Sequence, residues 1–166
     1  MTKRRDFNED SEHGFGPPPA WMHADILALH RYWLAKIGDA PIPDRADIDP
    51  VIEIPKLLAN VWLLDVVGEP RRFRYRLMGS NLTRATTRPR IGQYLDEQEG
   101  AGDIPETVAA LNTCCDRQIP YWRRGHPQLI RDRFLPMLEY VVLPMSVEHS
   151  AETRMLLNMT IYHWKD

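Results

Sequence analysis

The chain contains 166 residues, of which 43% are hydrophobic and 27% are charged, and its formal net charge at pH 7 is −2. A chain of this length can bury one hydrophobic core, so a single soluble globular domain is expected. Because the charges nearly balance, the composition excludes a protein that binds nucleic acid or acidic lipid through an overall positive charge.

The N-terminal segment, residues 1–19, combines charged residues with glycine and the run Pro17-Pro18-Pro19. Such a segment cannot bury enough apolar surface to order itself, so we expect a flexible leader. It lacks the apolar core of a signal peptide, and no later run approaches the ~20 apolar residues that span a bilayer. The sequence therefore predicts a cytoplasmic protein that does not associate with membranes.

Residues 20–37 predict an amphipathic helix at the start of the single domain, which we expect to extend over residues 20–166. Its apolar side chains recur every three or four residues and so share one stripe: Met22, Ile26, Leu29, Trp33 and Ile37. Leu27 and Leu34 add a second apolar edge, so the apolar surface exceeds what one contact needs. We therefore expect a homodimer that forms through Leu27, Trp33 and Leu34.

The next segment, from Asp44 to Pro50, contains turn-forming residues whose aspartates can accept backbone N–H bonds. We expect an ordered connector, then one short helical turn within residues 51–58. The run from Val61 to Val66 is β-branched and aromatic, as a buried strand should be. After a turn, residues 72–77 alternate arginine with apolar side chains at period two. Together they predict an antiparallel hairpin, because a slip of one residue would bury the arginines.

Two helices are predicted after this hairpin. Residues 80–88 form a short helix that ends before Pro89. Residues 103–118 form a longer helix with Asp103 as its cap and with one apolar face. Cys114 and Cys115 are adjacent on this helix and point in different directions, so no disulfide is expected between them. Reduced cysteines agree with a cytoplasmic location.

Three strand-like runs complete the chain. Residues 119–123 predict an edge strand, since Pro120 cannot donate to a ladder, and residues 133–145 and 154–162 predict a second hairpin. Strands and helices do not alternate along the chain, which excludes a doubly wound fold. The order instead predicts an α+β fold with a five-stranded antiparallel sheet.

Several short motifs occur together along the chain. The leading helix carries His30-Arg31-Tyr32-Trp33, and the linker from Pro43 to Pro50 is followed by Ile54-Pro55-Lys56-Leu57-Leu58. The hairpin contains Trp62-Leu63-Leu64-Asp65 and the run from Phe73 to Leu82, and Leu143-Pro144-Met145-Ser146 comes later. In these segments the chain resembles a divergent family of small bacterial PAS-like proteins. The resemblance implies a PAS-like fold with a helical crossover, and sensing or protein association rather than catalysis.

The resemblance also implies a ligand pocket between the inner face of the sheet and the helices. The expected lining is Phe73, Tyr75 and Leu77 from the second strand, Leu82, Leu111 and Cys114 from the helices, and Tyr121, Tyr140, Leu157 and Met159 from the later strands. Side chains of these types more commonly just fill a core, and that interpretation stays open here. Buried tyrosine hydroxyls favour a pocket, because a ligand or water can supply their hydrogen-bond partners.

No cofactor can be assigned, and no metal ligand is expected. Haem is a known PAS ligand, yet no histidine lies on a predicted pocket-forming helix. Flavin photochemistry needs a reactive cysteine in a motif that residues 112–117 do not match. The cofactor is therefore unknown, and a small, mostly apolar ligand is the expectation.

The arginine strand admits two interpretations. Arg72, Arg74 and Arg76 share one face and can hold an anionic ligand, an acidic partner or an RNA backbone. They can equally form a solvated face that stacks on Trp62 or neighbouring aromatic residues. The near-neutral net charge favours the solvated face and argues against nucleic acid.

We therefore expect a sensory or regulatory PAS-like module, not an enzyme, that binds a small apolar ligand or a partner protein. It would signal through association with a partner protein in trans. The sequence contains no nucleophile elbow, phosphate-binding glycine loop, zinc-binding helix motif or Cys-x-x-Cys pair. Two alternatives stay open: a nucleic-acid-associated protein that uses the arginine face, and a small-molecule enzyme of an α+β barrel type.

Overall fold

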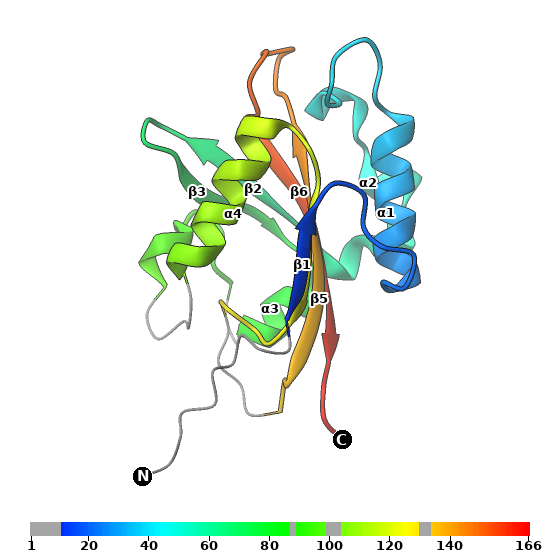
Figure 1. Cartoon of the computed structure of the whole chain (residues 1–166), viewed down its shortest axis with the longest axis vertical. Coiled ribbons are helices and arrows are strands. Elements are labelled where there is room, and N and C mark those ends of the chain that lie inside the picture. The colour runs from blue at the N-terminus through cyan, green and yellow to red at the C-terminus, as the bar shows by residue number, and fades with distance from the viewer. Residues whose placement is uncertain (1–10, 87–88, 99–103, 130–133) are drawn as a thin grey trace.

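A computed structural model describes residues 11–86, 89–98, 104–129 and 134–166 of the chain (Figure 1). Its centre is an antiparallel sheet of six strands in the order β1-β4-β5-β6-β2-β3. The strands are β1 (Glu12–Phe15), β2 (Val61–Val67), β3 (Arg72–Met78), β4 (Tyr121–Gly125), β5 (Met137–Met145) and β6 (Met155–His163). The α+β class and the antiparallel sheet are confirmed.

Helices cover both faces of this sheet. They are α1 (Ala24–Ala35), α2 (Pro50–Glu53), α3 (Ser80–Thr86) and α4 (Ile104–Arg117), with short 3-10 turns at Arg45–Asp47, Pro55–Asn60 and Leu95–Glu97. In Figure 1, α1 and α2 lie on one side of the sheet and α4 lies on the other. Residue 103, the predicted cap of α4, and residues 87 and 88 of the predicted short helix lie outside the described residues.

The first strand lies where we expected a flexible leader, and it raises the strand number from the predicted five to six. Residues Glu12–Phe15 pair with β4, and the backbone N–H of Gly16 donates to the carbonyl of Pro120 (2.8 Å). The Phe15 ring also packs against the Tyr121 ring. This segment cannot form a core of its own, but the edge of β4 supplies its backbone partners. The sheet therefore begins before residue 20, and residues 1–10 of the expected leader lie outside the described part.

A separate hydrophobic cluster covers each face of the sheet. On one face, Ile26, Leu29 and Trp33 of α1 pack against Leu143 and Leu157 of the central strands. On the other face, Leu111 and Cys114 of α4 pack against strand residues that include Tyr140 and Val142. Strands β5 and β6 are therefore buried on both faces, and for this reason both of their faces carry apolar side chains.

An irregularity in β3 changes which side chains face which cluster. Leu63 pairs with Leu77 but Leu64 pairs with Tyr75, so Arg76 is an extra residue in the ladder. Phe73 and Tyr75 belong to the cluster on the α4 side, whereas Leu77 packs on the α1 side. The predicted hairpin is confirmed, and its period-two alternation ends at this bulge.

The acidic linker is tied to the loop between β5 and β6. The buried carboxylate of Asp44 accepts hydrogen bonds from Ser146 Oγ (2.9 Å) and from the backbone N–H groups of His149 (2.8 Å) and Ala46 (3.1 Å). Asp49 caps the following helix by accepting from the N–H of Ile52. The expectation that these aspartates accept backbone N–H bonds is confirmed.

Candidate functional site

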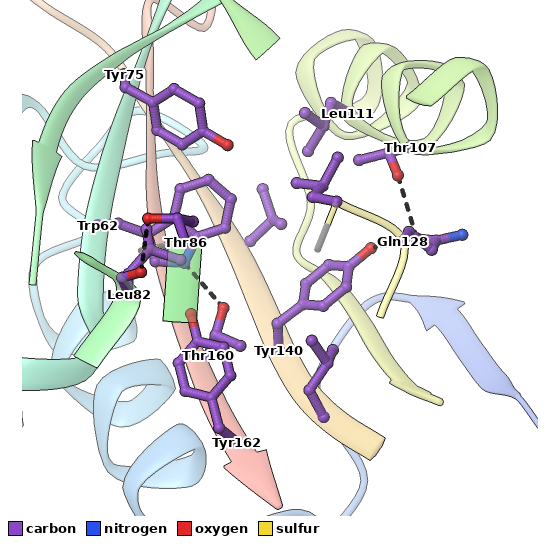
Figure 2. Close-up of a pocket in the computed structure, with 13 residues that line it drawn as sticks. Trp62, Tyr75, Leu82, Thr86, Thr107, Leu111, Gln128, Tyr140, Thr160 and Tyr162 are labelled. Atoms are coloured by element: carbon purple, nitrogen blue, oxygen red, sulfur yellow. Dashed lines mark hydrogen bonds between the residues drawn. The ribbon is translucent and has the colours of Figure 1, made fainter. Parts of the chain in front are cut away.

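A small cavity lies between α4 and the sheet (Figure 2), with a volume of about 40 Å³. Its walls come from β2, β3, β5, β6, α3, α4 and the segment after β4. The lining residues are Trp62, Tyr75, Leu82, Thr86, Thr107, Leu111, Gln128, Leu129, Leu138, Tyr140, Val142, Thr160 and Tyr162. A cavity of this volume holds about three water molecules, since each needs ~10–15 Å³. In this state it has no room for a haem or a flavin.

The strand side of the cavity is built around Trp62. The Trp62 ring packs against the ring of Tyr75, with centroids 5.9 Å apart. Its indole N–H donates to Thr160 Oγ1 on β6 (3.0 Å), a bond drawn as a dashed line in Figure 2. This hydrogen bond lets the indole be buried without an unpaired donor.

The helix side of the cavity is joined to β5 by one glutamine. The hydroxyls of Thr107 on α4 and Tyr140 on β5 both donate to Gln128 Oε1, at 3.2 and 3.3 Å. Tyr75 is held differently, because its hydroxyl accepts from Gln98 Nε2 (3.0 Å). The cavity wall therefore combines apolar side chains with hydroxyl and amide groups drawn from both the sheet and the helix.

The three tyrosine hydroxyls of the cavity lining remain protonated at neutral pH. Burial raises the pKa of Tyr75 to about 12, and it also raises the pKa values of Tyr140 and Tyr162 well above their usual range. The Tyr162 hydroxyl is buried and makes no hydrogen bond of acceptable geometry within the described ranges. These hydroxyls can donate hydrogen bonds to a bound molecule, and Tyr162 has the strongest need for a partner.

Four of the ten predicted pocket residues line the cavity: Tyr75, Leu82, Leu111 and Tyr140. Phe73, Cys114 and Tyr121 belong to the same buried cluster but lie behind the lining. Burial raises the pKa of Cys114 well above its usual value, so this thiol is not a nucleophile at neutral pH.

Leu77, Leu157 and Met159 were predicted as pocket residues, and this is wrong. All three pack in the cluster beneath α1, on the opposite face of the sheet. The bulge in β3 turns Leu77 away from the cavity. On β6 the prediction chose the wrong set of alternate residues, because Thr160 and Tyr162 face the cavity instead. Because β6 is buried on both faces, its apolar residues do not distinguish them, and only its alternating polar residues differ between the faces.

Several lining residues were not predicted at all. Thr107, Gln128 and Thr160 carry the polar contacts of the cavity, yet each is a common residue type with no motif around it. Trp62 was assigned to a buried strand without a cavity role. The one sequence signal available was the alternation along 156–162, where polar residues recur at every second position after Leu156.

The predicted dimer face is corrected in part. Trp33 is only 2% exposed, and its indole N–H donates to the carbonyl of Pro144 (2.9 Å), so it belongs to the core. Leu27 packs against the same cluster and is partly buried. Leu34 is 46% exposed, which makes it the most accessible of the three to a partner.

Two of the three strand arginines are engaged within the molecule. Arg72 pairs with both carboxylate oxygens of Asp96 (2.8 and 2.9 Å) and lies over the Tyr94 ring, 3.8 Å from its centroid. Arg74 pairs with Asp65 (3.2 Å), and Arg76 is exposed. The aromatic partner is Tyr94 rather than Trp62, which faces the cavity.

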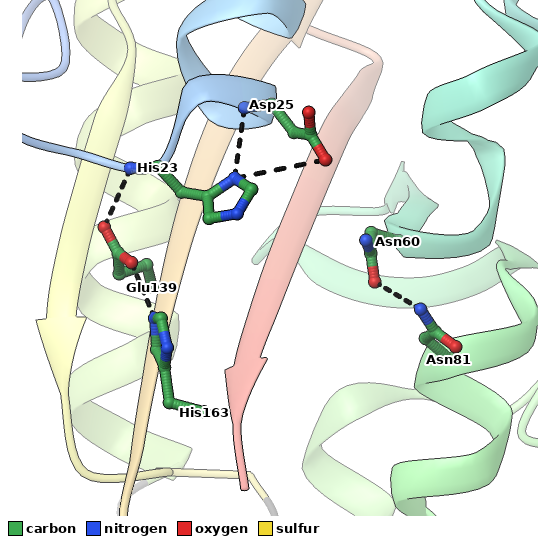
Figure 3. Close-up of polar contacts among 6 residues, drawn as sticks. All are labelled: His23, Asp25, Asn60, Asn81, Glu139 and His163. Carbon is green, nitrogen blue, oxygen red and sulfur yellow. Dashed lines mark hydrogen bonds and ion pairs between the residues drawn. The ribbon is translucent and has the colours of Figure 1, made fainter.

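A second polar cluster fastens the start of α1 to the sheet (Figure 3). Glu139 on β5 is buried and accepts from the backbone N–H of His23 (3.0 Å), while its other oxygen lies 2.7 Å from Nε2 of His163. Nearby, Asn81 Nδ2 donates to Asn60 Oδ1 (2.8 Å). These contacts hold α1, β5 and β6 together, and they join α3 to the turn before β2.

Neither a metal site nor a membrane span is found in the part of the chain that the structure describes. No three His, Cys, Asp or Glu side chains there are grouped so that they can hold a metal ion. No helix among the described residues is long and apolar enough to cross a membrane.

Comparison with known proteins identifies the family. The PAS domain family matches residues 22–156, which is most of the chain. A comparison with curated protein sequences finds no significant match. One similar solved structure, an RNA-binding light-oxygen-voltage receptor, has a TM-score of 0.47 and 13% sequence identity, and the match covers 92% of this chain but 38% of the receptor chain. The chain thus spans well under half the length of that receptor. By its family match the chain belongs to the PAS domain family, whose members are in general sensory and regulatory modules.

Proposed function

We propose that this protein is a sensory module that binds a small molecule in the cavity beneath α4 and signals through association with a partner protein. The observation that carries the proposal is the cavity itself. It is lined by hydroxyl and amide groups from both the sheet and α4, and it contains a buried Tyr162 hydroxyl that lacks a satisfactory partner. Pockets that combine an apolar wall with a few convergent polar groups are typical ligand sites.

The contacts of Gln128 suggest how occupancy is communicated. Gln128 joins Thr107 on α4 to Tyr140 on β5 through two hydrogen bonds of 3.2 and 3.3 Å. A ligand that bonds to either hydroxyl competes with these bonds and so favours a different position of α4. A ligand that binds one position of α4 more tightly than the other shifts the population toward that position. A partner that contacts α4 then responds to the change in population.

The ligand claim can be tested by filling the cavity. In Leu111→Phe the added ring occupies space in a cavity of about 40 Å³. Small molecules of a screening library that raise the melting temperature of the wild type should have no effect on this variant. Ala109→Phe is the matched control, because residue 109 is exposed on the same helix. If no compound raises the wild-type melting temperature, and native mass spectrometry detects no retained molecule, the proposal is refuted.

A homodimer is proposed separately from the partner at α4, and it rests on an exposed apolar surface at α1 and α2. Leu34 is 46% exposed, and Val51 and Ile52 on α2 are 63% and 76% exposed. Glu53 joins the two helices by accepting from Tyr32 and Lys36, both at 2.8 Å. We expect a homodimer in light scattering after size exclusion, and a monomer for Leu34→Glu. The control is Ile91→Glu, at another exposed apolar position. A wild-type monomer at micromolar concentration would refute the homodimer.

Nucleic-acid binding is the weaker candidate. It depends on the Arg72, Arg74 and Arg76 face, where two of the three guanidinium groups are already paired with Asp96 and Asp65. Paired arginines release fewer counterions on binding a phosphate backbone, so a strong salt-dependent affinity is not expected.

A further inference from the structure

One arginine is buried on the cavity side of the sheet and forms no ion pair with a carboxylate among the described residues. Arg123 on β4 is 2% exposed. Its Nη1 donates to the carbonyl of His126 (2.7 Å), and its Nε is buried without a partner. Within the described ranges no carboxylate pairs with it. A buried guanidinium that bonds to a neutral carbonyl and not to a carboxylate is costly, because a neutral partner replaces its lost hydration only in part.

The position of Arg123 in the sheet relates it directly to the cavity. Arg123 lies opposite Tyr140 on β5, and Tyr140 lies opposite Thr160 on β6, so the three residues form one row across the sheet. Tyr140 and Thr160 line the cavity. Burial raises the pKa of Tyr140 most. The positive charge of Arg123 opposes this rise and the smaller effect of the Glu106 carboxylate adds to it, as expected for charges close to that hydroxyl.

We propose that the cavity takes a short-chain carboxylate. The carboxylate would accept a hydrogen bond from the Tyr140 hydroxyl and be stabilised by the adjacent positive charge of Arg123. The alkyl chain would contact the apolar wall formed by Leu82, Leu111 and Val142. The volume of about 40 Å³ limits the ligand to a few heavy atoms. The ligand class rests on the proposed function, because it concerns the same cavity.

The decisive comparison is between butyrate and its neutral amide, butyramide, on the full chain at pH 7. The two molecules have nearly the same shape and differ in charge. We expect butyrate to raise the melting temperature and to give a measurable Kd by calorimetry, while butyramide binds at least roughly tenfold more weakly. Because the charge pair is buried, the affinity for butyrate should change little with salt.

Variants of adjacent arginines assign the effect to one side chain. Arg123→Met should abolish butyrate binding, and Arg123→Lys should restore part of it. Arg124→Met is the matched control, because Arg124 is the next residue on β4 and lies over Trp21 on the other face of the sheet. Loss of butyrate binding in Arg124→Met but not in Arg123→Met would overturn the assignment.

The wild-type comparison decides the question even if Arg123→Met does not fold. Equal binding of butyrate and butyramide would overturn the carboxylate assignment while leaving the proposed ligand cavity intact. If neither probe binds but neutral compounds of the library do, the carboxylate is likewise refuted and the sensory cavity stands. If no compound of either kind binds, both proposals fail.

Discussion

Replacing Asp44 with alanine should destabilise the protein by detaching the linker from the loop between β5 and β6. The carboxylate accepts hydrogen bonds from Ser146 Oγ, the His149 N–H and the Ala46 N–H, at 2.9, 2.8 and 3.1 Å. Burial by itself raises the pKa of Asp44, but these three bonds outweigh it and lower the pKa. The folded state therefore favours the ionised carboxylate.

The expected loss follows from these bonds. A hydrogen bond to a charged group contributes about 1.5–3 kcal/mol, and bonds that share one acceptor are not additive. Asp44→Ala leaves the buried Ser146 hydroxyl without its acceptor, so we expect the free energy of unfolding to fall by about 3 kcal/mol. For a chain of 166 residues each kcal/mol lowers the melting temperature by roughly 2–4 °C, so the total is roughly 6–12 °C.

The assay is urea denaturation followed by circular dichroism at several pH values. Because the folded pKa of Asp44 is lowered, its contribution is present above the unfolded value of about 3.9 and is lost as the pH falls through the folded pKa. The gap between wild type and Asp44→Ala should thus be constant from pH 7 to 5 and should shrink below about pH 4. Asp47→Ala, in the same linker, is the control. A difference of less than about 0.5 kcal/mol at pH 7 would refute the reasoning.

Three further predictions concern other parts of the fold. Gly79→Ala should lower the free energy of unfolding, measured by urea denaturation, by more than about 2 kcal/mol, because its Cβ would lie 2.5 Å from the backbone oxygens of Leu58 and Ala59. Gly38→Ala, with open space around it, should leave that free energy unchanged. Trp33→Phe should cost about 1–2 kcal/mol, since the buried Pro144 carbonyl loses its donor, and an unchanged stability would contradict this. Burial raises the pKa of Tyr75 to about 12, so its contribution is intact below about pH 10 and is lost as the pH rises toward that value. In Tyr75→Phe, the free energy of unfolding from urea denaturation should change less with pH above about pH 10 than in the wild type.

Local patterns in the sequence were enough to predict most of the elements. The stripe of α1, the hairpin of β2 and β3, the helix α4 and the final hairpin all follow from the spacing of apolar residues and from turn residues, which act over a few positions. Asp44 and Asp49 were also predicted as hydrogen-bond acceptors, because this use of an aspartate depends only on its own neighbours.

The candidate site was predicted less well, because its membership depends on side-chain direction. Arg76 is an extra residue in the β3 ladder, and it places Leu77 and Tyr75 on opposite faces of the sheet. The alternating sequence pattern does not indicate this bulge. Trp33 looked like a surplus apolar side chain, but its indole meets the Pro144 carbonyl from a distant strand. Contacts between residues so far apart in the chain leave no local signal.

The sequence by itself determined the order of the elements and their antiparallel α+β class, since periodicity and turn chemistry are local properties. Only the tertiary structure decided three other features. These are the pairing of β1 with the edge of β4, the face of β6 that meets the cavity, and the burial of Arg123 beside Tyr140. Each depends on which segments meet in space, and the apolar residues of a strand that is buried on both faces do not show which face meets a cavity.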